Sequence, residues 1–314
     1  MEFRIEGLIA AAFTPMHGDG TLRLELTEPI VDHLVEQGIR GLYVCGSTGE
    51  GPLLTTEERK ATAAAYVQAA AGRLPVIVQV GHSSLREART LAAHAQAIGA
   101  DAVSAVAPYY FKPDSVRTLI DCMAEITSAA PQLPFYYYHI PALSGVGVDV
   151  LEFLREGGRR LPTLVGVKYT APTVFEFQAC VEFDVGRFDV LFGCDEMLLA
   201  ALAVGARGAV GTTYNLAPAL YGKIIDRFEA GDLAEARRCQ ALAVEMVRIM
   251  VRYRGQPAFK AAMKLFGLDC GPNRLPLRSL QPDEWEKLRT ELAAIGFLDW
   301  ATSGGTRNEN GNMG

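Results

Sequence analysis

Short apolar segments alternate with longer amphipathic segments along the first 216 residues of the 314-residue chain. Each apolar segment spans six or seven residues and is apolar on both faces, which is typical of parallel strands covered by helices on each side. We therefore predict eight strands, at residues 7–13, 41–46, 75–81, 101–107, 134–140, 163–168, 188–193 and 206–212.

The segments between these strands carry apolar residues at helical spacing, and several end on a glycine, as helix C-caps do. The clearest examples are residues 26–38, 54–72, 83–99 and 195–205. Eight such strand–helix units close into a (β/α)8 barrel, and a doubly wound open sheet is the alternative. The GxGxxG fingerprint of a dinucleotide-binding sheet is absent after the first strand, which favours the barrel.

The pattern changes after about residue 216, where the predicted strands stop. Three helical segments follow, near residues 232–253, 257–267 and 282–295. We assign residues 1–216 to the barrel strands and most of the barrel helices, and residues 217–300 to the last barrel helix and a C-terminal helical extension. Residues 301–314 are small, polar and rich in Gly and Asn, so we expect a disordered tail there.

The composition is that of an ordinary globular protein, with 49% hydrophobic and 21% charged residues. The net charge is −6 and the basic residues are dispersed, which argues against nucleic-acid binding. No stretch reaches the roughly 18 apolar residues needed to cross a bilayer, and the start of the chain carries acids where a secretory leader carries only basic charge. We therefore expect a cytoplasmic protein that binds neither nucleic acid nor membranes.

The cysteine and histidine spacings indicate no metal or other cofactor. The six cysteines lie far apart and form no CxxC pair, which favours buried thiols in a reducing compartment. The five histidines form none of the HxH, HExxH or HxxxH spacings of common metal sites.

The active site of an α/β barrel lies where its strands deliver their carboxyl-terminal ends. At the predicted strand ends, hydroxyl groups dominate, with one lysine, one acidic pair and no metal-ligand set. The candidates are Thr14, Pro15, Ser47, Thr48, Tyr109, Tyr110, Tyr138, His139, Lys168, Thr170, Asp195, Glu196, Thr212 and Thr213. This collection suits carbonyl chemistry through an amine better than hydrolysis or phosphoryl transfer.

Lys168 is the strongest candidate, because it ends the apolar run LVGVKYT at residues 164–170. An amine desolvated in a barrel mouth has a lowered pKa, and its free base can attack a ketone to give a Schiff base. The alternative is a lysine whose side chain extends from the strand end to solvent. If Lys168 points into the barrel, strand alternation places Thr170 on the same side and Tyr169 outside.

The segment GSTGE at residues 46–50 follows the second predicted strand. Its two hydroxyls and the backbone N–H groups of a glycine-flanked turn suit an anion. The GK[ST] element of a Walker loop is absent, so a carboxylate is a better ligand than a triphosphate. The alternative is an ordinary turn in which Ser47 or Thr48 caps the next helix.

The segment YYYHIPALSG at residues 136–145 places Tyr138 at a strand end, where it could move protons during imine formation and bond cleavage. The alternative is a core tyrosine, and we expect the adjacent His139 to face away from the barrel in a structural role. The sequence leaves open whether Tyr109 and Tyr110 are core, loop or interface residues. For Asp195 and Glu196, helix N-capping is the alternative to substrate binding.

Together these motifs resemble the dihydrodipicolinate synthase / N-acetylneuraminate lyase family of Schiff-base (β/α)8 enzymes. The resemblance runs from about residue 5 to residue 298. Its marks are GLYVCGSTGE with LTTEER behind it, DAVSAVAPYY, YYHIPALSG, GVKYT and GAVGTTYN, all in the family's order.

The resemblance implies roles for individual residues. Lys168 resembles the lysine that forms the imine, and Tyr138 the tyrosine that relays protons with the substrate carboxylate. Ser47 and Thr48 are similar to the carboxylate-binding hydroxyls. Tyr110 is similar to the tyrosine that completes the hydroxyl relay across a subunit interface, and a homotetramer is implied.

The choice of subfamily rests on fewer residues. Dihydrodipicolinate synthases usually carry an arginine shortly after the strand-end tyrosine, whereas this stretch has Leu143 and no arginine. The ALSG sequence and the Asp195–Glu196 pair resemble the lyases, in which that pair binds the hydroxylated tail of the sugar acid. Other implied substrate contacts are Thr170, Gly193 and Thr212, the last in place of a common serine.

Cys194 and His139 depart from the usual aromatic residue and asparagine of the lyases. Despite these two differences, the ALSG sequence and the acidic pair make the lyases the better match. The resemblance implies reversible cleavage of N-acetylneuraminate to pyruvate and N-acetylmannosamine. Alternatives are another 2-keto acid aldolase, acting on 2-keto-3-deoxy sugar acids or 4-hydroxy-2-oxoglutarate, a dihydrodipicolinate synthase-like enzyme, or a catalytically silent keto-acid-binding regulator.

Overall fold

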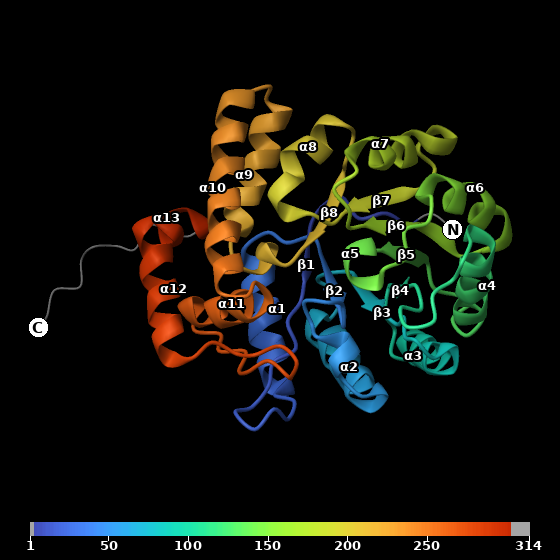
Figure 1. Ribbon diagram of the computed structural model, residues 1–314, viewed down its shortest axis with the longest axis horizontal. Helices are drawn as coiled ribbons and strands as arrows, with labels where there is room; N and C mark the ends of the chain where they lie inside the picture. The colour runs from blue at the N-terminus through green and yellow to red at the C-terminus, as the bar shows by residue number, and fades with distance from the viewer. Residues whose placement is uncertain (1–2, 303–314) are drawn as a thin grey trace, which may run out of the picture.

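The computed structural model describes residues 3–302 and contains a closed barrel of eight parallel strands in sequence order, with the last strand paired to the first (Figure 1). The strands are β1 (Gly7–Ala11), β2 (Gly41–Val44), β3 (Val76–Gln79), β4 (Ala102–Val106), β5 (Phe135–His139), β6 (Leu164–Tyr169), β7 (Asp189–Phe192) and β8 (Gly208–Gly211). This closure confirms the (β/α)8 prediction over the open sheet.

Helices follow the strands as the periodicity predicts. The barrel helices are α1 (Thr27–Glu36), α2 (Thr56–Ala70), α3 (Leu85–Ala97), α4 (Val116–Thr127), α6 (Val150–Arg160), α7 (Val174–Glu182), α8 (Leu198–Ala203) and α9 (Pro218–Glu229). Short 3-10 turns are η1 (Leu24–Leu26), η2 (Gly51–Leu53), η3 (Phe183–Gly186), η4 (Asp195–Met197), η5 (Thr213–Asn215) and η6 (Met263–Phe266). A further helix that was not predicted from the sequence, α5 (Pro141–Ser144), forms a single turn after β5.

The start of α2 illustrates the local physics. Thr55 accepts a hydrogen bond from the Glu58 backbone N–H at 3.2 Å, and the Glu58 carboxylate accepts one from the Thr55 N–H at 2.9 Å. This capping box satisfies backbone donors that the first helical turn leaves unpaired.

Two hydrophobic clusters separate the inside of the barrel from its outside. The larger cluster lies between the strands and the helices, and the smaller one fills the barrel with inward-facing side chains such as Ile9, Tyr43, Ile77, Tyr136 and Leu191. The alternation of residues along each strand therefore decides which side chains can reach the barrel mouth.

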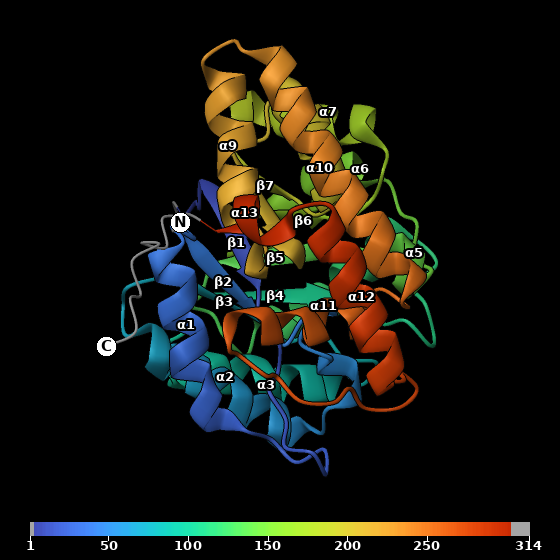
Figure 2. The same cartoon turned by 90° about the vertical axis from the view of Figure 1, so that its left-hand side faces the viewer.

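The C-terminal extension comprises α10 (Leu233–Arg252), α11 (Gln256–Ala262), α12 (Pro282–Ala294) and α13 (Phe297–Ala301). Figure 2 shows α10 beside α9, with α11 and α12 continuing along the same side of the barrel. Ala301 was expected to begin a disordered tail, but it is buried at the end of α13, which contacts α9. The rest of that predicted tail, from residue 303, lies outside the described residues.

Within residues 3–302, no helix combines the length and the apolarity needed to cross a membrane. All six cysteines are free thiols.

Candidate active site

Lys168 lies near the end of β6 with its side chain inside the barrel, only 4% exposed. Its Nζ lies 3.8 Å from the ring centroid of Tyr43 and 4.2 Å from that of Tyr138. Burial lowers the pKa of Lys168 to about 7, and the nearby Asp195 limits the shift by favouring the ammonium form. The solvent-exposed alternative is therefore wrong, and an appreciable fraction of the amine is neutral at neutral pH.

Tyr138 lies directly beside Lys168, because the two residues are register partners on β5 and β6. Its hydroxyl lies 3.4 Å from the Ser47 hydroxyl, a long contact for two hydroxyl groups. Burial raises the pKa of Tyr138 to about 12, so the phenol keeps its proton at neutral pH. The geometry gives a hydroxyl pair next to the amine that can accept and return a proton.

The GSTGE segment forms a tight loop between β2 and η2. The Thr48 hydroxyl lies 2.6 Å from the Thr212 hydroxyl, directly after β8, so the loop is joined to a strand end that only β1 separates from β2. Gly51 is required, because a Cβ there would lie 1.9 Å from the Cys45 carbonyl oxygen. The N-cap of α2 is Thr55, so the alternative in which Ser47 or Thr48 caps that helix is wrong.

The two carboxylates of the acidic pair, Asp195 and Glu196, have different environments. Asp195 is buried and accepts hydrogen bonds from the Thr213 backbone N–H at 2.8 Å and the Thr213 hydroxyl at 2.6 Å. Burial raises the pKa of Asp195 to about 6. Glu196 is exposed, and the N-caps of η4 and α8 are Cys194 and Met197, without side-chain capping bonds. Neither acid therefore caps η4 or α8, the helical segments next to them in the chain.

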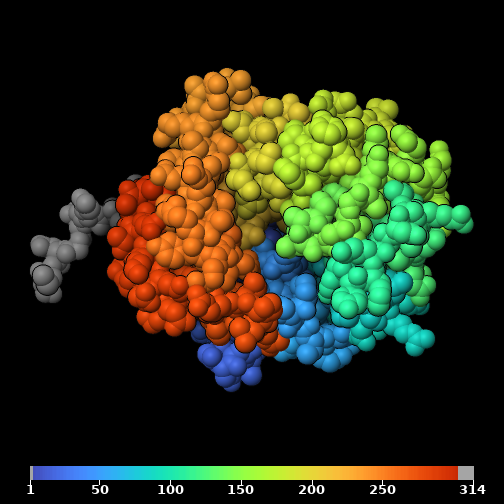
Figure 3. Space-filling model, in the orientation of Figure 1, coloured from blue at the N-terminus to red at the C-terminus, as the bar shows by residue number. Residues whose placement is uncertain are grey.

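Thr170 presents a buried hydroxyl that has no hydrogen-bond partner among residues 3–302. Gly193 makes room for it, because a Cβ at Gly193 would lie 2.1 Å from the Thr170 Oγ1. A buried hydroxyl without a partner costs stability, and a bound polar molecule would supply the missing bond. Figure 3 shows a hollow between the orange α10–α11 side and the green segment around α5.

Tyr110 is the one predicted catalytic residue that the single chain does not bring to the site. It is 78% exposed and packs edge-on against Phe111, with ring centroids 5.0 Å apart. Leu143 is also exposed. Tyr109 is half-buried and packs against the interior cluster instead.

His139 faces away from the barrel interior, as the alternation predicts. Its ring stacks on Tyr169 with centroids 5.3 Å apart, and burial lowers the pKa of His139 to about 4. It therefore packs as a neutral core side chain.

Tyr43 belongs to the site although the sequence analysis did not select it. Its ring faces the Lys168 amine, and its hydroxyl donates to the Ser104 hydroxyl at 3.0 Å. The available signal was an aromatic residue facing inward in the middle of an apolar strand. Within residues 3–302, no cluster of three or more His, Cys, Asp or Glu side chains could hold a metal ion.

Comparisons with known proteins agree with this architecture. The family model described as "Dihydrodipicolinate synthetase family" matches residues 4–295. The N-acetylneuraminate lyase of Xenopus tropicalis is 42% identical over 306 residues, covering 95% of this chain and all of that protein. The human N-acetylneuraminate lyase is 38% identical over 302 residues, covering 95% of this chain and 94% of that protein.

Solved structures give the same result. The N-acetylneuraminate lyase of Proteus mirabilis superposes with a TM-score of 0.92 at 38% identity, covering 94% of this chain and all of that one. The sialic acid aldolase of Aliivibrio salmonicida also gives 0.92, at 39% identity, covering 94% of this chain and 98% of that one. The matches extend over nearly the whole barrel and its helical extension, and the chain belongs to the dihydrodipicolinate synthetase family.

Proposed function

We propose that this protein is a Schiff-base aldolase that reversibly cleaves N-acetylneuraminate into pyruvate and N-acetylmannosamine. The observation that carries the proposal is the desolvated amine of Lys168, held between two tyrosine rings beside the Ser47–Tyr138 hydroxyl pair. The names of its relatives, at 37–42% identity, indicate the substrate.

In the proposed reaction, the neutral Lys168 amine adds to the C2 ketone of the open-chain sugar acid to give a carbinolamine. Tyr138 protonates the carbinolamine oxygen through Ser47, water leaves, and a protonated imine and the Tyr138 phenolate remain. Ser47 and Thr48 hold the C1 carboxylate. The Tyr138 phenolate then takes the proton of the C4 hydroxyl, assisted by that carboxylate. The C3–C4 electron pair moves toward the imine nitrogen, which gives an enamine and the aldehyde of N-acetylmannosamine. Tyr138 gives this proton to C3 of the enamine. Water then hydrolyses the resulting imine to release pyruvate and the free amine, and the proton set free returns to the Tyr138 phenolate.

Residues around the amine suit the rest of the substrate. The unpartnered Thr170 hydroxyl and the space at Gly193 are available to polar groups of the sugar acid, with Thr212 holding Thr48. We assign the hydroxylated tail to Glu196, which is exposed, and to Asp195, whose carboxylate is fixed by Thr213.

We also propose a cytoplasmic homotetramer. The six free thiols fit a reducing compartment. Tyr110, Phe111 and Leu143 are exposed large side chains, a pattern that fits burial against a second copy of the chain. In that assembly Tyr110 would join the Tyr138 relay of a neighbouring subunit. A monomer mass in solution that persists with full activity would contradict this part of the proposal.

The test is a pyruvate-release assay with N-acetylneuraminate and a series of 2-keto-3-deoxy sugar acids, with 4-hydroxy-2-oxoglutarate alongside. We expect N-acetylneuraminate to give the highest kcat/KM. Glu196→Gln should raise KM for that long polyhydroxylated substrate more than for a short keto acid. Preference for a short keto acid, or pyruvate binding without turnover of any substrate, would reject the assignment. Lys168→Ala must abolish borohydride trapping with pyruvate.

A further inference from the structure

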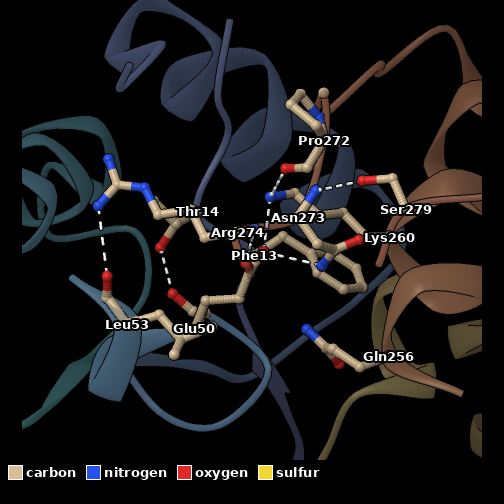
Figure 4. A network of polar contacts seen from close by, with 12 residues as sticks. Phe13, Thr14, Glu50, Leu53, Gln256, Lys260, Pro272, Asn273, Arg274 and Ser279 are labelled. Carbon is tan, nitrogen blue, oxygen red and sulfur yellow. Dashed lines mark hydrogen bonds and ion pairs between the residues drawn. The ribbon is translucent and has the colours of Figure 1, made fainter. Parts of the chain in front are cut away.

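Glu50, the last residue of the GSTGE segment, joins the substrate-binding loop to the C-terminal extension through a fully buried ion pair and two partly buried hydrogen bonds (Figure 4). Its Oε1 accepts from the Lys260 ammonium of α11 at 2.7 Å and from the Asn273 side-chain amide at 2.9 Å. Its Oε2 accepts from the Arg274 backbone N–H at 2.9 Å. Both side chains of the Glu50–Lys260 ion pair are 0% exposed.

The loop around this carboxylate has an unusual backbone. Cys45 and Glu50, which flank Ser47 and Thr48, both adopt left-handed conformations, with φ of 60° and 56°. Such conformations cost energy in residues other than glycine and persist where surrounding contacts hold them. The hydrogen bonds to the Glu50 carboxylate all come from the extension, whereas the Glu50 backbone bonds within the loop, to Ser47 and Leu53.

A second contact reaches the loop from the same helix. The Gln256 side-chain amide of α11 donates to the Thr48 carbonyl oxygen. The Lys260 ammonium also donates to the Pro272 carbonyl oxygen at 2.8 Å, so the ion pair fixes the extension as well as the loop. Thr48 is therefore held on one side by Thr212 of the barrel and on the other by α11.

We propose that Glu50, Lys260 and Gln256 are positioning residues that hold Ser47 and Thr48 in the orientation needed to bind the substrate carboxylate. The C-terminal extension is thereby part of the active site although it supplies no catalytic group. A buried ion pair adds little net stability compared with apolar residues, whereas it specifies one arrangement of the groups it joins. This inference rests on the carboxylate-binding role of Ser47 and Thr48 in the proposed function.

The test compares Lys260→Met, Gln256→Leu and the charge-matched double variant Glu50→Gln/Lys260→Met. The control is Lys287→Met, which removes an exposed ion pair with Asp283 in α12 of the same extension. The first readout is the pyruvate concentration that gives half-maximal borohydride trapping at Lys168. The second is amide hydrogen exchange of the peptide covering residues 45–54, which requires no activity.

We expect Lys260→Met to raise the half-saturating pyruvate concentration about tenfold or more, because small displacements of binding groups are costly. Maximal trapping at saturating pyruvate should remain, since Lys168 is untouched. Gln256→Leu should have a smaller effect, the double variant should recover part of the loss, and the control should match wild type. Exchange of residues 45–54 should accelerate in the same order.

A lowered melting temperature with unchanged pyruvate affinity and unchanged exchange of residues 45–54 would overturn the inference, because it indicates a merely structural role. If Lys260→Met does not fold, Gln256→Leu decides by the same two readouts. Wild-type protein that traps pyruvate without cleaving N-acetylneuraminate would reject the proposed function and leave the positioning role standing. If wild type traps no pyruvate, the proposed function fails, and the exchange measurement alone decides whether α11 orders the loop.

Discussion

Two buried aspartates lie at opposite ends of the barrel, one at the start of strand β7 and one shortly after its end. Their surroundings differ. Asp189 begins the strand and accepts hydrogen bonds from the Tyr136 hydroxyl at 2.6 Å and the Ile5 backbone N–H at 3.2 Å. Asp195 follows the strand and accepts from Thr213, with the Lys168 amine nearby. Burial raises the pKa of each carboxyl to about 6.

The tyrosines of β5 repeat this contrast. Tyr136 and Tyr138 both point into the barrel, and the Tyr136 hydroxyl is fully engaged by Asp189 at the amino-terminal end. At the carboxyl-terminal end, the Tyr138 hydroxyl makes a long contact with Ser47 and lies near the Thr170 hydroxyl, which has no well-formed hydrogen bond in the described residues. The amino-terminal end completes its hydrogen bonds internally and stabilises the fold, whereas the carboxyl-terminal end keeps polar groups available for a ligand.

The largest effect is expected for Lys168→Met, at the carboxyl-terminal end. Removing the amine should abolish both borohydride trapping with pyruvate and pyruvate release from N-acetylneuraminate. The same change should raise the free energy of unfolding below pH 7 by up to a few kcal/mol, because each pKa unit corresponds to about 1.4 kcal/mol. Mass spectrometry of the trapped enzyme and urea unfolding at pH 6 measure the two effects.

The stability effect has a definite pH window. The unfolded chain holds the Lys168 proton up to about pH 10.5, whereas the folded protein releases it near pH 7. Between these values the unfolded state binds more protons, so the wild-type penalty is full below pH 7 and is relieved as the pH rises. A Lys168→Met variant that is less stable than wild type at pH 6 would show that the amine is not desolvated.

The next largest effect is expected when one tyrosine hydroxyl is removed at each end of the barrel. Tyr138→Phe should lower kcat about 10²- to 10⁴-fold, the usual contribution of a positioned acid–base group, with little change in stability. Tyr136→Phe should leave kcat unchanged and lower the free energy of unfolding by about 1–3 kcal/mol, because Asp189 loses its closest donor. Steady-state kinetics and urea unfolding of both variants measure the four values.

The two variants are each other's control, since both delete one oxygen from an inward-facing ring of the same strand. A kcat loss in Tyr136→Phe as large as that in Tyr138→Phe would remove the distinction between the two ends. So would an unfolding penalty of equal size in both.

The pH dependence of imine formation gives a smaller effect. Since the pKa of Lys168 is about 7, the initial rate of trapping with pyruvate should fall about tenfold per pH unit below that value. Asp195→Asn should move the midpoint to lower pH, because the Asp195 carboxylate favours the ammonium form. A wild-type midpoint above about pH 9 would indicate a solvated amine and contradict the buried geometry.

The sequence predicted the barrel and the central pair of the site because both follow from strand periodicity. All eight strands were located, and alternation placed Lys168 and Tyr138 at neighbouring strand ends, where the register makes them partners. It also placed His139 outside. Strand ends were less well defined, because extended residues can continue beyond the last ladder bond.

Features set by contacts between distant segments could not be predicted in this way. Glu50 and Lys260 are 210 residues apart, and neither spacing nor periodicity relates them. Asp195 and Glu196 are adjacent in sequence, yet the turn η4 buries one and exposes the other. The role proposed for Tyr110 requires a second copy of the chain, which no pattern within one sequence specifies.

The smallest effect is expected when a neutral amide replaces either Asp189, at the start of β7, or Asp195, beyond its end. In each carboxylate one oxygen, Oδ2, accepts both of the hydrogen bonds described above, so an Asn side-chain oxygen can keep them. Between about pH 4 and pH 6 the folded protein holds a proton on Asp189 that the unfolded chain releases, so this group lowers wild-type stability as the pH rises. The stability of Asp189→Asn relative to wild type should therefore increase by about 1–3 kcal/mol from pH 4 to pH 7, measured by urea unfolding.

Asp195→Asn should give the same trend but also raise KM for N-acetylneuraminate, whereas Asp189→Asn should not. A changed KM in Asp189→Asn would mean that the amino-terminal end of the barrel also affects substrate binding. An unchanged KM in Asp195→Asn would mean that the Asp195 carboxylate does not contribute to substrate binding.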